Sequence, residues 1–94
     1  MIRHIVMWKF RGDAQEQAEE FLRRLAALEG VIPCIRAMRV LRSAETGSAY
    51  DAVLIADFDS LEAVQQYKDD PRHRAVSALC KEIRTDRRAI DVTL

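Results

Sequence analysis

The sequence predicts an α+β domain, with four antiparallel strands in one sheet and helices on one of its faces. The first observation is strand character in four segments, residues 2–10, 35–42, 49–58 and 86–93. The second is helical spacing of apolar residues between Asp13 and Gly30, and again between Ser60 and the last strand. The third is their order, strand–helix–strand–strand–helix–strand, which is typical of the ferredoxin-like fold.

The first strand, "IRHIVMWKF", alternates strictly over residues 2–10. One face carries Ile2, His4, Val6, Trp8 and Phe10. The other face carries Arg3, Ile5, Met7 and Lys9. Because both faces include apolar side chains, we expect both sides of this strand to be covered.

The first helix is expected to follow the turn "RGD". Asp13 and Glu16 have the spacing of a capping box, with Asp in place of the usual Ser or Thr. An apolar stripe then recurs at helical spacing and consists of Ala18, Phe21, Leu22, Leu25 and Leu28. Gly30 and, just beyond it, Pro33 end the helix.

The second and third strands form an antiparallel hairpin, because only the small polar segment "SAETGS" separates them. In the third strand, one face carries Tyr50, Ala52, Leu54, Ala56 and Phe58. The opposite face carries Asp51, Val53, Ile55 and Asp57.

The second helix is predicted to be broken in two. Either Asp59 with Glu62, or Ser60 itself, caps its first half, whose inner face carries Leu61, Val64 and Tyr67. Pro71 cannot lie inside this helix but fits the first turn of a new one, with Asp70 as N-cap. The inner face of the new helix carries His73, Val76, Cys80 and Ile83.

With helices on one face, the other face of the sheet keeps an apolar patch of Ile5, Met7, Val53 and Ile55. Left bare, this patch would be too large for a monomer in water. A second copy packed sheet against sheet would cover it, so the sequence predicts a two-fold homodimer.

Composition narrows the classes of partner. The 94 residues indicate one domain, 1–94, and 15 basic residues balance 15 acidic ones, so neither nucleic acid nor an anionic membrane is an expected partner. Cys34 and Cys80 lack metal-ligand spacing, and no export signal or membrane span precedes them. We therefore expect reduced cysteines, a cytoplasmic location and no metal or cofactor; capping explains Asp70 better than metal ligation does.

His73 is the leading candidate for a functional residue. It follows the helix break near a helix N-terminus, where the dipole and partial burial both favour the neutral imidazole. If the Trp8 face of the first strand meets the helices, His4, Tyr67 and His73 converge on one apolar pocket. The alternative is structural, because an inward-facing histidine is more commonly a hydrogen-bonded core residue than a catalytic one. A perturbed pKa is more frequent at functional sites but does not by itself identify one.

Several segments resemble the stress-responsive A/B barrel domain (Dabb) family. They are "MIRHIVMWKF", "LEGVIPCIRAMRV", "AYDAVLIADFDSLEAVQQYKDDPRH" and "RRAIDV". The tyrosine, then a proline, then a histidine two places later is the most specific element. The resemblance covers nearly the whole chain and implies a dimeric α+β barrel.

Similarity to olivetolic acid cyclase-type polyketide cyclases implies roles for individual residues. His73 would be a general base, with Tyr67 and His4 as its partners in aldol cyclisation of a small apolar carbonyl substrate, without a cofactor. The implied substrate-binding residues are Val6, Trp8, Phe21, Leu22, Leu25, Leu54 and Ala56. This sequence departs from the family pattern at two positions that matter for such a role. The family usually has histidine at the position of Asp70. Trp8 is larger than the aliphatic residue usual at its position and would fill the pocket.

Two other functions compete with the cyclase hypothesis. One is a non-catalytic, stress-responsive dimer that binds a small ligand or stabilises an assembly, with structural histidines. The other is a monooxygenase or haem degrader on the same fold, which lacks support from any redox-cofactor motif.

Overall fold

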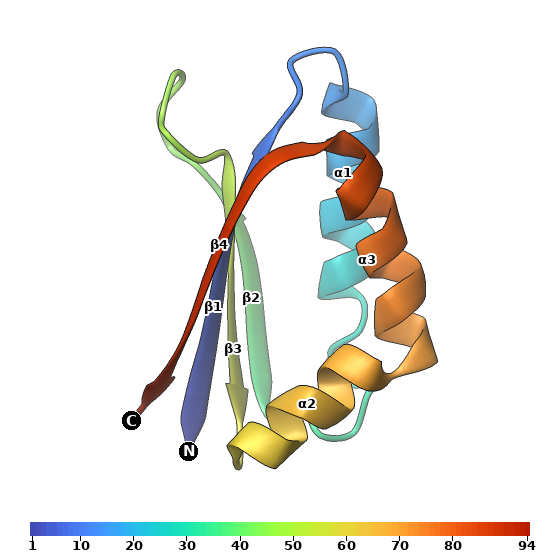
Figure 1. Ribbon diagram of the computed structural model, residues 1–94, viewed down its shortest axis with the longest axis vertical. Coiled ribbons are helices and arrows are strands. Elements are labelled where there is room, and N and C mark those ends of the chain that lie inside the picture. Colours follow the sequence, from blue (N-terminus) through green and yellow to red (C-terminus); the bar gives the residue numbers. More distant parts are fainter.

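The computed structural model describes all residues, 1–94, and has one sheet with three helices on one side of it (Figure 1). In chain order the elements are β1 (Ile2–Phe10), α1 (Gln15–Ala26), β2 (Ala37–Arg42), β3 (Ala52–Phe58), α2 (Leu61–Asp69), α3 (Pro71–Ile83) and β4 (Arg84–Thr93). α1 and α3 lie side by side over the sheet, and α2 crosses its end. This is the predicted ferredoxin-like α+β fold, with the second helix divided as expected.

The four strands are antiparallel and lie in the order β2-β3-β1-β4. β1 is therefore central, and its register with β4 places His4 directly opposite Asp91 and Trp8 opposite Arg87. His4, Val6, Trp8 and Phe10 are buried beneath the helices. The Trp8 face is thus the helix-facing one, which is the condition that the pocket hypothesis required.

Two strands begin later than predicted. β2 begins at Ala37 and not at residue 35, and β3 begins at Ala52 and not at residue 49. At the start of β3 the Asp51 carboxylate accepts hydrogen bonds from the Phe10 amide, at 2.9 Å, and from the Lys9 ammonium group, at 3.1 Å. The Asp51 side chain thus accepts a hydrogen bond that a backbone carbonyl would accept in a regular sheet. The alternation of apolar and polar residues in the sequence does not reveal this.

The helix caps were predicted correctly at two of three positions. Ser60 accepts a hydrogen bond from the Ala63 amide, and Asp70 accepts one from the Arg72 amide at 2.8 Å. The predicted cap at Asp13 is wrong: Ala14 precedes α1, no side chain caps it, and the Asp13 carboxylate pairs with Arg11. Leu61 was also misplaced, because it lies in the first, solvent-facing turn of α2 and is 62% exposed.

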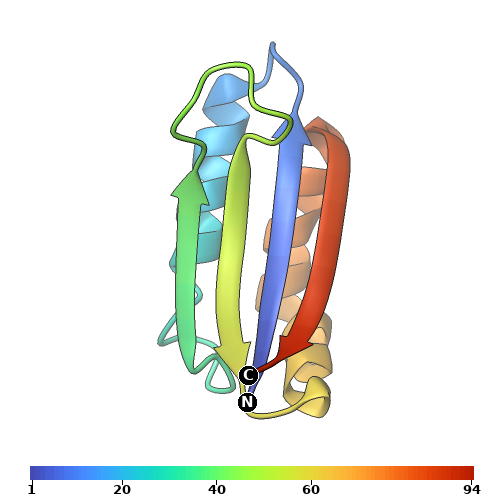
Figure 2. The ribbon, with the colours of Figure 1, turned by 90° about the vertical axis from the view of Figure 1, so that its left-hand side faces the viewer.

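The face of the sheet away from the helices is open (Figure 2). Ile5, Met7, Val53 and Ile55 are adjacent there, because Ile5 pairs with Ile55 and Met7 with Val53. Ile90 of β4 extends this patch and is 58% exposed. None of the three helices combines the length and the apolar character needed to cross a membrane.

The caps give a direct stability test. Ser60→Ala should lower the free energy of unfolding by about 1 kcal/mol, because the Ala63 amide loses its acceptor. Asp13→Ala is the matched control and should change it far less, since Asp13 caps nothing. Urea unfolding of both variants measures the difference, and an equal or larger loss for Asp13→Ala would contradict the assignment of caps.

Candidate active site

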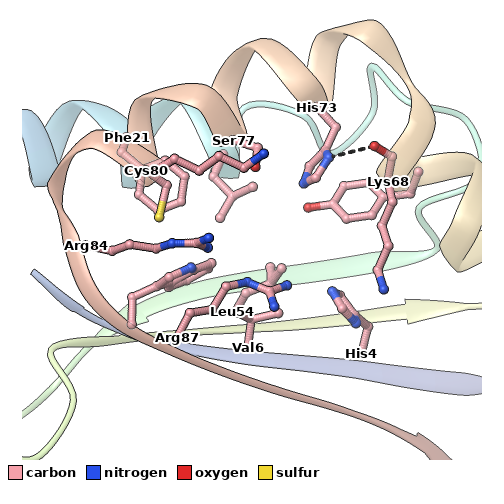
Figure 3. Close-up of a pocket in the computed structure, with 14 residues that line it drawn as sticks. His4, Val6, Phe21, Leu54, Lys68, His73, Ser77, Cys80, Arg84 and Arg87 are labelled. Carbon is pink, nitrogen blue, oxygen red and sulfur yellow. Dashed lines mark hydrogen bonds between the residues drawn. The ribbon is translucent and has the colours of Figure 1, made fainter.

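A cavity of about 310 Å³ lies between the helices and the sheet, bounded by β1, β3, α1 and α3 and by the ends of α2 and β4 (Figure 3). Its apolar wall comes from strand residues Val6, Trp8 and Leu54 and from α1 residues Phe21 and Leu25. Trp8 packs edge-on against Phe21, with ring centroids 5.2 Å apart, and it lines the cavity that remains beside it.

The structure brings together eight of the ten residues predicted for the site. His4, Tyr67 and His73 line this cavity together with the five apolar residues named above. Leu22 and Ala56 do not line it, contrary to expectation. Leu22 faces β2 and lines a separate hollow with Val40, while Ala56 lies opposite His4 with a single methyl group that is wholly enclosed.

The helix break explains the position and the protonation of His73. In a continuous helix the Lys68 carbonyl would accept the Arg72 amide, four residues on. Here the Arg72 amide instead donates to the Asp70 carboxylate, and the Lys68 carbonyl accepts from His73 Nδ1 at 3.2 Å. Because a carbonyl can only accept, Nδ1 carries a proton, and in the neutral imidazole Nε2 then keeps its lone pair.

His73 is also held neutral by its surroundings. Burial lowers its pKa below the usual 6.5, and the nearby His4 and Arg87 act in the same direction, while the Lys68 carbonyl opposes them. Its imidazole packs against the Tyr67 ring, with centroids 4.3 Å apart. A neutral imidazole with a free Nε2 beside a cavity can accept a proton from a bound molecule.

His4 has the same arrangement, with a carboxylate in place of the carbonyl. Its Nδ1 donates to Asp91 Oδ1 at 2.6 Å, which again leaves Nε2 as the bare nitrogen. Burial lowers the pKa of His4, and Asp91 partly offsets this effect. Sequence reasoning missed Asp91; alternation along the last strand offers it as a candidate, but only the register shows that it faces His4.

Tyr67 is the one buried side chain with an unsatisfied polar atom. The residue is 1% exposed, and its hydroxyl has no hydrogen-bond partner in the protein. Burial raises the pKa of this phenol well above its usual value, so it stays protonated and can donate. Since buried hydroxyls are normally bonded, an oxygen atom of a bound molecule is the natural partner for this one.

Five further polar residues line the cavity and were also missed. They are Lys68, Ser77, Lys81, Arg84 and Arg87. Arg87 lies opposite Trp8 in the register, on the helix-facing side of β4. Its side chain is exposed to solvent and also lines the cavity.

Taken together, the cavity presents two bare imidazole nitrogens, one free phenolic donor and an apolar wall. No carboxylate lines it, since Asp91 lies behind His4. Such a set can remove a proton from a neutral molecule and donate a hydrogen bond to the oxygen on which negative charge develops.

Comparison with solved structures shows the same fold over nearly the whole chain. A dimeric ferredoxin-like protein from Bacteroides fragilis is 28% identical, with a TM-score of 0.89 over 99% of this chain and 95% of that one. A dimeric ferredoxin-like protein from Thermobifida fusca is 27% identical, with a TM-score of 0.86 over 99% and 90%. A hydroxynitrile lyase from Passiflora edulis has a TM-score of 0.85 over 99% and 92%, but at 11% identity it shows only the shared fold.

Sequence comparison identifies the family. A search of curated proteins found no significant match. The family model described as the stress-responsive A/B barrel domain, however, matches residues 2–94. This match covers the whole fold from β1 to β4. The chain therefore belongs to the stress-responsive A/B barrel domain (Dabb) family.

Proposed function

We propose that the protein is a cofactor-independent enzyme that removes a proton next to a carbonyl group, in the manner of a polyketide cyclase. The observation that carries the proposal is the orphaned Tyr67 hydroxyl beside the neutral imidazole of His73. Such a pair matches what enolate formation requires, a base for the carbon-bound proton and a donor for the carbonyl oxygen.

The reaction steps balance without any other reactant. His73 Nε2 takes a proton from the carbon between two carbonyl groups, and the electrons of that C–H bond move onto the oxygen that Tyr67 contacts. The enolate carbon then attacks a second carbonyl of the same molecule, forming a C–C bond and an alkoxide. The proton on His73 returns to this alkoxide, so the base is restored.

The apolar wall and His4 would position the substrate. Trp8, Phe21 and Leu25 give a surface for a hydrocarbon chain, and the cavity of about 310 Å³ suits a small linear molecule. His4, fixed by Asp91, can accept a hydrogen bond from a hydroxyl or enol group through Nε2. A protein that binds such a ligand without turning it over would use the same contacts, and the test below separates the two.

We also propose that the protein is a homodimer through the open sheet face. Two relatives at 27–28% identity are described as dimeric, and here the patch around Ile5 and Met7 has no cover. Burying this face would remove Ile90 from water as well. The cavity lies on the opposite side of the sheet, so this pairing leaves its mouth open.

Proton abstraction can be tested with a neutral β-diketone, such as nonane-2,4-dione, in deuterated buffer. NMR should show enzyme-catalysed exchange at the carbon between the carbonyls. His73→Ala should abolish the exchange, and Tyr67→Phe should slow it by about 10²-fold, the loss typical of one oxyanion donor. Tyr50→Phe is the matched control, since the Tyr50 hydroxyl bonds Asp86 away from the cavity.

The same variants distinguish catalysis from a structural role. A structural His73 would give no exchange in the wild type. His73→Ala should cost roughly 1–3 kcal/mol of stability in either case by leaving the Lys68 carbonyl unpaired, so the exchange decides between the two roles. Exchange that persists unchanged in His73→Ala would refute the assignment of the base.

The dimer can be tested with Met7→Lys. This change places a charge in the middle of the proposed interface, so the variant should dissociate at concentrations where the wild type is dimeric. Ala75→Lys, on the exposed side of α3, is the control and should remain dimeric. Light scattering gives the mass of each, and a monomeric wild type at micromolar concentration would contradict the proposal.

A further inference from the structure

We propose that the substrate of this cavity carries a carboxylate, which Arg84 and Arg87 bind at the β4 side of the cavity, with Lys68 and Lys81 beside it. The inference rests on the proposed function in one respect: it takes this cavity as the substrate site. It adds the chemical class of the substrate, an acid with an apolar chain and an internal carbonyl group.

The distribution of ion pairs is the first observation. Nine of the 15 basic residues form an ion pair with a carboxylate of the protein. Of the six that do not, four line this single cavity, namely Lys68, Lys81, Arg84 and Arg87. In a chain with no net charge, most of the unpaired cations are thus gathered at one place.

The direction of the side chains is the second observation. In Figure 3 the guanidinium groups of Arg84 and Arg87 reach into the space between α3 and the sheet, and the Lys68 ammonium group lies on the His4 side. Burial is the main cause that lowers the pKa of His4 and of His73, and the charge of Arg87 lowers both pKa values further. Arg84 and Arg87 therefore reach the site, although Arg87, like Lys81, is also exposed to solvent.

No group in the cavity wall neutralises these cations. Asp91, which lies behind His4, is bonded to that histidine. Cys80 lies next to Arg84, but burial raises its pKa to about 11, so it stays a neutral thiol at pH 7. A bound anion is the partner that the arrangement lacks.

The apolar wall beside the cations favours a carboxylate attached to a hydrocarbon chain. Guanidinium groups present two parallel N–H donors that match two oxygens of a carboxylate or a phosphate. The apolar wall of Trp8, Phe21 and Leu25 lies in the same cavity and suits a hydrocarbon chain. A keto acid would place its chain on this wall, its carbonyl at Tyr67 and its carboxylate at the arginines.

The test compares two ligands of equal size that differ in charge, octanoate and octanamide. Binding is measured by calorimetry and by fluorescence of Trp8, the single tryptophan of the chain, which lines the cavity. Octanoate should bind about tenfold more tightly than octanamide, equivalent to about 1.4 kcal/mol. This preference should weaken with added salt and disappear in the double variant Arg84→Gln/Arg87→Gln.

Arg23→Gln is the matched control, because Arg23 also lacks an ion pair but lies outside this cavity. It should keep the full preference for octanoate. Circular dichroism confirms that the arginine variants are folded before binding is compared.

Three results would overturn the proposal. They are equal affinity for the acid and the amide, a preference that survives in the double variant, and no binding of either ligand at millimolar concentration. A further outcome would also contradict it. If coenzyme A displaces octanamide while octanoate binds no more tightly than octanamide, the cations bind the phosphate groups of coenzyme A and not a substrate carboxylate. A clear preference for octanoate together with no exchange of the neutral β-diketone would leave the carboxylate site standing and reject the proposed catalysis.

Discussion

The candidate site depends on one interruption in the backbone, the break between α2 and α3 at Pro71. Proline removes the amide that the Tyr67 carbonyl would accept, and Asp70 takes the Arg72 amide that the Lys68 carbonyl would accept. The freed Lys68 carbonyl then holds His73 by Nδ1. A single local feature thus ends one helix, starts the next and fixes the tautomer of the proposed base.

The electrostatics of the cavity follow from burial without internal compensation. Both histidines are pushed toward neutrality by desolvation, and the phenol of Tyr67 is kept protonated by the same cause. Arg87 on β4, which has no carboxylate partner, lowers the pKa of both histidines further but acts against burial at Tyr67. A neutral base and uncompensated positive charge can coexist here because Lys81 and Arg87 are exposed to solvent, while His4 is buried and His73 is half-buried.

Sequence patterns were sufficient for the elements whose signals are local. Alternation in residues 2–10, proline chemistry at Asp70-Pro71 and helical spacing after His73 predicted the strands, the divided helix and the inward histidine. The cap at Asp13 failed because its carboxylate has a closer partner in Arg11. The roles of Asp91 and Arg87 could not be predicted from the sequence, because only the β1–β4 register shows that they lie opposite His4 and Trp8. A register shifted by one residue would turn both side chains to the other face of the sheet. The prediction that Leu22 lines the cavity was wrong because the apolar stripe of α1 has two sides. Phe21 and Leu25 face the cavity, whereas Leu22 faces β2.

The central claim is that His73 is neutral and protonated on Nδ1, with Nε2 bare beside the cavity. Nitrogen-15 NMR of the imidazole ring at pH 7 tests it directly, because the two ring nitrogens give different shifts in each tautomer and in the imidazolium ion. We expect the neutral Nδ1–H form, with a titration midpoint below the usual 6.5. An imidazolium at pH 7, or a proton on Nε2, would contradict the account.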